Sequence, residues 1–297
     1  MNNPRIPYQK FDERKLLLPP QGKSLIVHLV VNVEQWLFQN PMPRKLLTAP
    51  HNLELIPDIP NYSWAEYGMR CGMPRLLNCF SERELPASVS LNAGVIHTYK
   101  KLADAMLDAG WEFIGHGVQQ ESIQGAADEA SVIHQSISLI EEFTGSRPQG
   151  WLSPGLKETV DTPDILKKEG IRYVFDWVLD DLPCWMKTKN GPLISMPYTL
   201  ELNDSVVYAI EKHSSPELYR RLKDTLNLFD REIKRQPRVL TLGLHPHLIA
   251  VPHRFLYLEQ MLDLLQKRSD TVFMTGKKIA DWFETVEPSS KELNLGN

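Results

Sequence analysis

The stretch LIVHLVVNVE, residues 25–34, decides the fold. It is apolar almost throughout, interrupted only by His28 and Asn32 before it ends at Glu34. An apolar run of this kind is typical of a parallel strand that is covered on both faces. Similar short runs recur along the chain and alternate with helical patterns, which predicts βα units around a parallel sheet. The predicted strands are residues 25–34, 87–94, 112–117, 150–153, 173–177, 193–198, 239–245 and 271–275.

Helices are predicted between these strands. Ile133, Ile137 and Ile140 share one face of a helix over residues 129–143, and two more helices are predicted over 216–234 and 252–267. No repeat, low-complexity tract or Gly/Ser linker divides the 297 residues, so we predict a single domain. Residues 1–23 form an N-terminal extension. The proline-rich residues 39–63 form a long loop that we expect to cover the active site.

Composition excludes several classes of function. The net charge is −4 and no long basic run occurs, so neither a nucleic acid nor an anionic membrane is an expected partner. The three cysteines Cys71, Cys79 and Cys184 fit no zinc-binding spacing and indicate free thiols in a reducing compartment. The N-terminal segment lacks an apolar leader, and the first apolar stretch is too short to span a bilayer. We therefore expect a cytoplasmic protein.

Polar residues follow several of the predicted strands. In barrels of parallel strands, catalytic groups lie at the carboxyl ends of the strands, where these residues would converge. Asn32 and Glu34 end the first strand, His116 ends the third, and His245 and His247 end the seventh. A solvated strand end for Glu34 and a structural role for His116 stay open, and one of the paired histidines could serve only to support a loop.

Trp151 follows the fourth strand and Asp181 the fifth. A tryptophan there could stack on a planar ligand, although packing is the commoner role in a barrel. The sequence contains no GxSxG, GxxxxGK[ST], GxGxxG or HExxH motif, so other familiar chemistries find no support.

Taken together, these segments resemble the polysaccharide deacetylase superfamily. Within it they are similar to the branch of metal-independent allantoinases of urate catabolism and bacterial cyclic imide hydrolases. The resemblance runs from about residue 25 to residue 283 and implies an α/β fold, a distorted (β/α) barrel of the polysaccharide deacetylase type. The strings that carry it are VVNVE from Val30, PMPR ending at Arg44, EYGMRCGMPRLL from Glu66, IGHGVQQ from Ile114, GWLSPG from Gly150, DWVLDDLPCW from Asp176, MPYTLELND from Met196 and LGLHPHLI from Leu242.

The departures from the family pattern concern the metal. Metal-dependent deacetylases carry two aspartates after the first strand and an HxxxH pair. Here Asn32 replaces the first aspartate, Glu34 stands near the second, and Gln120 follows His116 where the second histidine would be. An amide is a poor zinc ligand, so the resemblance implies that no cofactor is required. The site could still gather an adventitious or weakly bound zinc ion.

The resemblance implies a hydrolase that opens a small cyclic imide by attack of water on a ring carbonyl. LGLHPHLI is similar to the imide-hydrolase branch, whereas allantoinases tend to have cysteine and arginine after the first histidine. DDLP and PYTLELND favour the alternative, an allantoinase-type hydrolase of a cyclic ureide. A metal-dependent N-deacetylase of an acetylated sugar ranks third, and a catalytically lapsed binding protein comes from a different class. The branch also implies a homo-oligomer.

The resemblance gives each candidate residue a role. Glu34 or His116 activates the water while the other holds it or relays the proton, and His245 protonates or polarises the ring. Arg70, with Arg44 as a weaker candidate, binds a carbonyl or carboxylate. The other expected substrate-binding residues are Asn32, which stabilises the oxyanion, Asp181, which orients a histidine or accepts a ring N–H, Trp151 and His247.

Overall fold

The computed structural model describes residues 3–290, so the first two residues of the predicted N-terminal extension lie outside the described residues. Within residues 3–290, nine strands form one sheet. Every predicted strand is present, usually shorter at its carboxyl end, and one short strand, β6, was not predicted. The strands are β1 Leu25–Val33, β2 Ser88–Leu91, β3 Glu112–Gly115, β4 Gly150–Trp151, β5 Tyr173–Val174, β6 Cys184–Met186, β7 Leu193–Ser195, β8 Arg238–Leu244 and β9 Thr271–Phe273.

The sheet runs in the order β6-β7-β5-β4-β3-β2-β1-β8, with β9 paired to β1. All pairs are parallel except β6 with β7. The sheet curls into a half-barrel. Across the seam toward β8, an isolated bridge joins Asn203 to Gly243, and the backbone N–H of Val239 donates to the carbonyl oxygen of Asp181 at 2.9 Å. The expected α/β fold, a single-domain distorted barrel, is confirmed.

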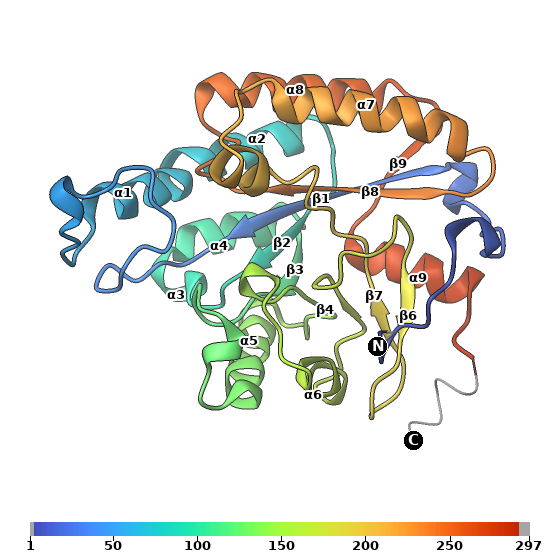
Figure 1. Cartoon of the computed structure of the whole chain (residues 1–297), viewed down its shortest axis with the longest axis horizontal. Helices are drawn as coiled ribbons and strands as arrows, with labels where there is room; N and C mark the ends of the chain where they lie inside the picture. Colours follow the sequence, from blue (N-terminus) through green and yellow to red (C-terminus); the bar gives the residue numbers. More distant parts are fainter. Residues whose placement is uncertain (1–2, 291–297) are drawn as a thin grey trace.

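Helices lie on both sides of the curled sheet, as Figure 1 shows. α2, α7 and α8 lie along the upper side of the view, α5 and α6 along the lower side, and the covering loop (residues 39–63) projects with α1 at the left. The predicted helices correspond to α5, α7 and α8. The helices are α1 Ile59–Tyr67, α2 Met73–Glu82, α3 Val95–Thr98, α4 Lys100–Asp108, α5 Glu129–Thr144, α6 Thr162–Lys168, α7 Glu217–Glu232, α8 Pro252–Gln266 and α9 Gly276–Val286, with π-helical turns at Gly68–Gly72 and Ser205–Ile210.

The period-two alternation of the strands selects the residues that reach the barrel mouth. In β1, Leu29, Val31 and Val33 pack in the cluster beneath the outer helices, whereas Ile26 and Val30 belong to a second cluster inside the barrel. Successive side chains of a strand point to opposite faces. The side chain of Asn32 therefore points to the inner side of the barrel. The side chain of Glu34, which directly follows the strand, points to the same side.

The same alternation applies to two other strands. Ile114 of β3 and Val239 of β8 lie in the inner cluster, while Phe113 and Leu244 lie in the outer one. His116 and His245 have the parity of the inner residues, so the sequence itself directs both rings toward the mouth of the barrel.

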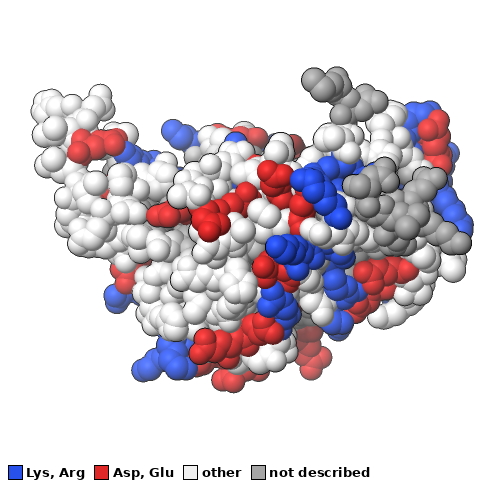
Figure 2. All heavy atoms as spheres, turned by 90° about the horizontal axis from the view of Figure 1, so that it is seen from below, with Lys and Arg blue, Asp and Glu red and all other residues white. Residues whose placement is uncertain are grey.

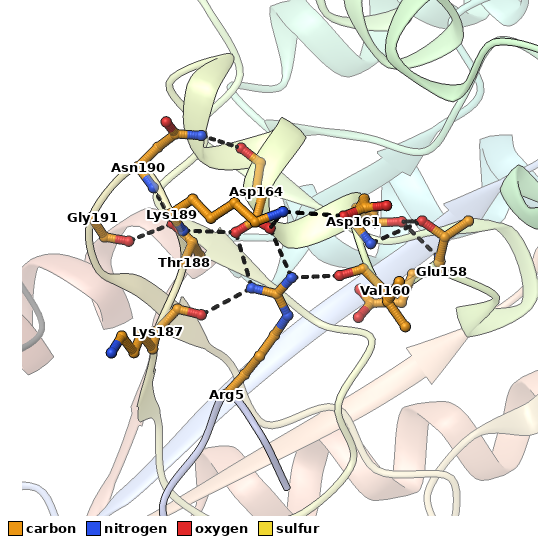
Figure 3. A network of polar contacts seen from close by, with 12 residues as sticks. Arg5, Glu158, Val160, Asp161, Asp164, Lys187, Thr188, Lys189, Asn190 and Gly191 are labelled. Atoms are coloured by element: carbon orange, nitrogen blue, oxygen red, sulfur yellow. Dashed lines mark hydrogen bonds and ion pairs between the residues drawn. The ribbon is translucent and has the colours of Figure 1, made fainter. Parts of the chain in front are cut away.

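The N-terminal extension spans the seam of the half-barrel. Arg5 forms two hydrogen bonds of 3.0 Å with the carboxylate of Asp164 and pairs with the backbone of Lys187 on the β6 side, as Figure 3 shows. Farther along, the amide of Leu17 donates to the side chain of Gln236, just before β8. The extension therefore ties together the two edges of the sheet that do not pair with each other.

The three cysteines are free. Over residues 3–290, no helix is long and apolar enough to cross a membrane. On the face in Figure 2, acidic and basic side chains of the described residues lie interspersed without a continuous basic area.

Candidate active site

Glu34, His245 and Asp204 form a buried chain of charged groups at the barrel mouth. Nδ1 of His245 donates to Oδ1 of Asp204 at 2.6 Å, and Nε2 lies 3.5 Å from Oε1 of Glu34. Oδ2 of Asp204 accepts the backbone N–H groups of His245 at 2.7 Å and Ile249 at 3.1 Å. Asp204 therefore fixes both the ring of His245 and the loop that carries it.

These contacts set the charges of the chain. Burial lowers the pKa of His245, but the charge and hydrogen bond of Asp204, with those of Glu34, outweigh it and raise that pKa to about 9. Burial raises the pKa of Glu34, but His245 opposes this with a hydrogen bond and its charge, and that pKa falls to about 2. At neutral pH, His245 is therefore an imidazolium that can donate a proton, and Glu34 is a carboxylate.

His116 has the opposite protonation state. Its Nδ1 lies 2.5 Å from the carbonyl oxygen of Leu152, which only accepts, so Nδ1 carries the hydrogen. Its Nε2 is buried and has no hydrogen-bond partner in the described part of the chain. Burial lowers the pKa of His116. The ring is therefore neutral, with a lone pair on Nε2 that is free to accept a proton.

His247 has a different setting. Its ring meets that of Trp64 edge to face with centroids 4.9 Å apart, and burial lowers its pKa to about 3. The π-helical turn after α1 lies directly on this segment. A Cβ added at Gly68 would lie 2.6 Å from the backbone nitrogen of His247, and one at Gly72 would lie 2.2 Å from the carbonyl oxygen of Pro246. The two glycines therefore let the helix approach the histidine loop closely.

The start of the covering loop lies beside Gln120, next to this cluster. It helps to enclose a cavity of about 240 Å³, small beside the roughly 300–1,000 Å³ of pockets for drug-sized ligands. Gln120, on the opposite wall, donates to Oε1 of Glu34 at 2.9 Å. Aromatic rings border a neighbouring hollow next to Glu34. The cavity is lined by Gln35, Trp36, Leu37, Asn40, Pro41, Met42, Pro43, Gln119, Gln120 and Glu121, and the hollow by Glu34, Trp36, Tyr62, Ala65, Glu66, Met69 and Tyr99.

Asn32 reaches the interior but already has partners. Its Nδ2 donates to the hydroxyl of Tyr198 at 3.0 Å and to the carbonyl oxygen of Leu244 at 3.3 Å. Both hydrogens of this amide are therefore engaged within the barrel wall, and its N–H groups are poorly placed to receive an oxyanion.

The structure does not bring three other predicted residues to the cluster. Arg70 points outward from the π-helical turn, with its side chain 73% exposed and bound to Glu66. Trp151 is fully buried and its Nε1 donates to Ser153, so it packs the core and offers no face to a ligand. The side chain of Asp181 is 56% exposed and lies at the seam.

Asp204 and Tyr198 belong to the site but were not among the residues predicted from the sequence. Asp204 ends the string MPYTLELND and Tyr198 lies within it, so the string itself was the available signal. Tyr198 ends the predicted strand 193–198, whereas Asp204 ends no predicted strand, and nothing in the strand pattern points from it to His245.

The residues present do not fit a metal site of the Asp-His-His type. The amide N–H of Gln120 donates to Glu34, so a hydrogen-bond donor stands where a second imidazole would offer a lone pair. The amide of Asn32 likewise donates within the wall. Over residues 3–290, no group of three His, Cys, Asp or Glu side chains is arranged to hold a metal ion. The chemistry of this donor set instead suits acid–base hydrolysis, in which one nitrogen takes a proton from water and another protonates a leaving group.

Comparisons with known proteins agree with this class. The polysaccharide deacetylase family matches residues 62–174. The peptidoglycan deacetylase of Helicobacter pylori is 25% identical over 254 residues, covering 74% of this chain and 86% of that protein. A crystal structure from Pseudomonas aeruginosa PAO1, a "probable polysaccharide deacetylase", is 26% identical with a TM-score of 0.81, covering 90% of this chain and 93% of that one. Puue allantoinase is 23% identical with a TM-score of 0.80, covering 97% and 96%.

The chain therefore carries a match to the polysaccharide deacetylase family over residues 62–174 and has the fold of the similar Pseudomonas aeruginosa structure over 90% of its length. It is a hydrolase, of the class that cleaves carbon–nitrogen bonds other than peptide bonds.

Proposed function

We propose that the protein opens a small cyclic imide by attack of water on a ring carbonyl, without a required metal. The observation that carries this proposal is the opposite protonation of two buried histidines in one cluster, neutral His116 and cationic His245. Ring opening needs both states at once, since one group must take a proton from water and the other must give one to the departing nitrogen.

His116 is the better base of the two candidates. A carboxylate with a pKa of about 2, as in Glu34, holds a proton weakly at neutral pH. The imidazole of His116 keeps a free lone pair on Nε2, and the negative charge of Glu34 favours the imidazolium that forms there. Glu34 also has a buried oxygen, Oε2, without a partner among the described residues, which can hold the attacking water.

The reaction then proceeds through proton transfers between protein and substrate. Water adds to the ring carbonyl and loses a proton to His116. The carbon–nitrogen bond breaks, and the nitrogen takes a proton from His245. A second carbonyl on the imide nitrogen stabilises this leaving group, so less electrophilic assistance is needed than for an ordinary amide. The ring opens to a chain with one carboxylic acid and one amide. The acid gives its remaining proton to His245 and becomes a carboxylate, and His116 releases its proton to solvent, which restores both histidines.

The cavity of about 240 Å³ is lined by Gln120, which donates to Glu34, and its size favours a small ring over a polymer chain, although Glu34, His116 and His245 do not line it themselves. The string LGLHPHLI favours an imide. Allantoin is the second candidate, because the likeness to Puue allantoinase extends over 97% of this chain.

Purified, chelator-treated protein should be assayed with succinimide and allantoin side by side, then again with added zinc. Opening of succinimide without metal is the expected result. Opening of allantoin alone would keep the metal-free chemistry but change the substrate. Activity that appears only with zinc would refute the metal-free site and favour an acetylated sugar.

The expected homo-oligomer stays a prediction. The covering loop and the start of α1 expose six aliphatic side chains. Exposed apolar side chains that lie close together are typical of protein–protein interfaces. Mass measurement by light scattering would test it. These side chains are Leu46, Leu47, Leu53, Leu55, Ile56 and Ile59.

A further inference from the structure

We propose that Arg44 is a catalytic residue whose guanidinium binds the ring-carbonyl oxygen as that oxygen becomes negative during attack by water. The inference rests on the proposed function and concerns the electrophilic half of the same reaction. Arg44 ends the string PMPR on the covering loop, directly after Met42 and Pro43, which line the small cavity beside Gln120.

The first observation is a buried donor without an acceptor. Nη1 of Arg44 is buried and has no hydrogen-bond partner in residues 3–290. Its neighbour Lys45, by contrast, forms an ion pair with Glu54 on the same loop. A buried donor left unsatisfied is costly, and more so when it is charged, so an acceptor from a ligand is expected at this atom.

The second observation places this charge at the cluster. Burial is the main influence on the pKa of both Glu34 and His247, and the charge of Arg44 adds a downward effect on each. Arg254 acts on His247 as well, but its guanidinium donates to the carbonyl of Leu248 and lies 4.2 Å from the ring centroid of Tyr208. Among the described residues, Nη1 of Arg44 has no such partner, so it stays available to a substrate.

The third observation is the shortage of other donors for an oxyanion. The N–H groups of Asn32 are engaged with Tyr198 and Leu244, and Arg70 lies on the surface. The donor set does not fit a metal that could polarise the carbonyl. A guanidinium on a loop that covers the substrate can take this part, because a preorganised cation in a closed site stabilises charge that develops there.

The electrons balance with Arg44 in this role. As the oxygen of water bonds to the carbonyl carbon, the pair of the C=O π bond moves to the carbonyl oxygen, which Arg44 binds as an oxyanion. When the carbonyl re-forms, the C–N bond breaks and its electron pair stays on nitrogen, which takes the proton of His245.

The test compares Arg44→Ala and Arg44→Lys with the matched control Lys45→Ala in the full-length, chelator-treated protein. We expect Arg44→Ala to lower kcat for succinimide by about 100-fold or more, as for loss of one oxyanion donor, while KM changes little. Added guanidinium chloride at millimolar concentration should restore part of the rate of Arg44→Ala. Arg44→Lys, which keeps the charge, should lose less, and Lys45→Ala should behave as wild type.

The outcomes separate the two proposals. A wild-type protein that opens neither succinimide nor allantoin refutes the proposed function, and the role of Arg44 with it. An active wild type combined with a kcat of Arg44→Ala within about threefold of normal refutes only the role of Arg44. A loss seen in KM alone, or one that guanidinium does not relieve in a variant with unchanged Tm, also refutes it and assigns Arg44 to binding or structure.

Discussion

Replacing Asp204 with asparagine tests whether His245 acts as the acid. The pKa of His245 lies at about 9 against an ordinary 6.5. That difference corresponds to about 3 kcal/mol in favour of the imidazolium. Asp204 supplies the larger part of it, and Glu34 supplies the rest. At alkaline pH, kcat/KM should fall as His245 loses its proton. Without the charge of Asp204, we expect this fall to occur at a pH about one to two units lower.

The substitution also disturbs the hydrogen bonds of the histidine loop. Both oxygens of Asp204 accept, one from Nδ1 of His245 and the other from two backbone N–H groups. In asparagine one of these oxygens becomes an NH₂ group, so a donor faces a donor in either orientation of the amide. We expect a loss of about 1–3 kcal/mol in the free energy of unfolding.

The stability of the variant should depend less on pH. The folded-state pKa of His245 is raised, so its contribution to wild-type stability is full below pH 6.5 and is lost as the pH rises through about 9. The assay is kcat/KM for ring opening between weakly acidic and alkaline pH, with Tm measured at each pH. Asp181→Asn, at the exposed seam, is the control and should keep the wild-type profile. A basic limb that stays in place in Asp204→Asn would refute the assignment of His245 as the acid.

Three further substitutions probe the packing, the lost metal ligand and the N-terminal extension. Gly68→Ala brings a methyl group within 2.6 Å of the backbone nitrogen of His247, so kcat/KM should fall and the free energy of unfolding should drop by about 1–3 kcal/mol; unchanged kinetics would contradict the close packing. Gln120→His offers a second imidazole, so zinc retained after dialysis, measured by mass spectrometry, should rise above the wild-type level; equal retention would contradict the reason given for the lost site. Arg5→Ala should lower the free energy of unfolding by about 1–3 kcal/mol in urea titrations. Burial raises the pKa of Asp164, but Arg5 and Lys189 lower it to about 2. The Arg5–Asp164 pair therefore stabilises the fold fully above pH 3.8, and this stabilisation is lost as the pH falls toward 2. A stability difference between wild type and Arg5→Ala that persists at the lowest pH would contradict this role of the pair.

The inner residues at the strand ends could be predicted from the sequence. The alternation along β1 continues past Asn32 to Glu34, and the positions of His116 and His245 follow from the same rule in β3 and β8. Local periodicity carries this information because each residue stands within two positions of its strand.

Asp204 could not be placed in this way. It lies 41 residues before His245 in the sequence, on a segment that crosses the seam without a paired strand. The direction of the Arg70 side chain depends on the helix that leads to it. No helix was predicted there, because residues 39–63 were interpreted as a loop and no helix was assigned after them. The structure begins α1 at Ile59 and inserts a π-helical turn at Gly68–Gly72, which turns Arg70 outward.

The place of β1 in the sheet has a consequence for how the protein is made. This strand, with nine buried residues, leaves the ribosome early, but it pairs with β8 and β9, which follow more than 200 positions later. Contacts of such long sequence separation slow folding. β2 can pair with one edge of this strand much earlier, but the other edge has no partner until β8 and β9 have been made, and it is open to aggregation until then. Chaperones that hold nascent chains should matter for the yield of this protein, and shortening the chain before β9 should cost solubility before it costs any catalytic group.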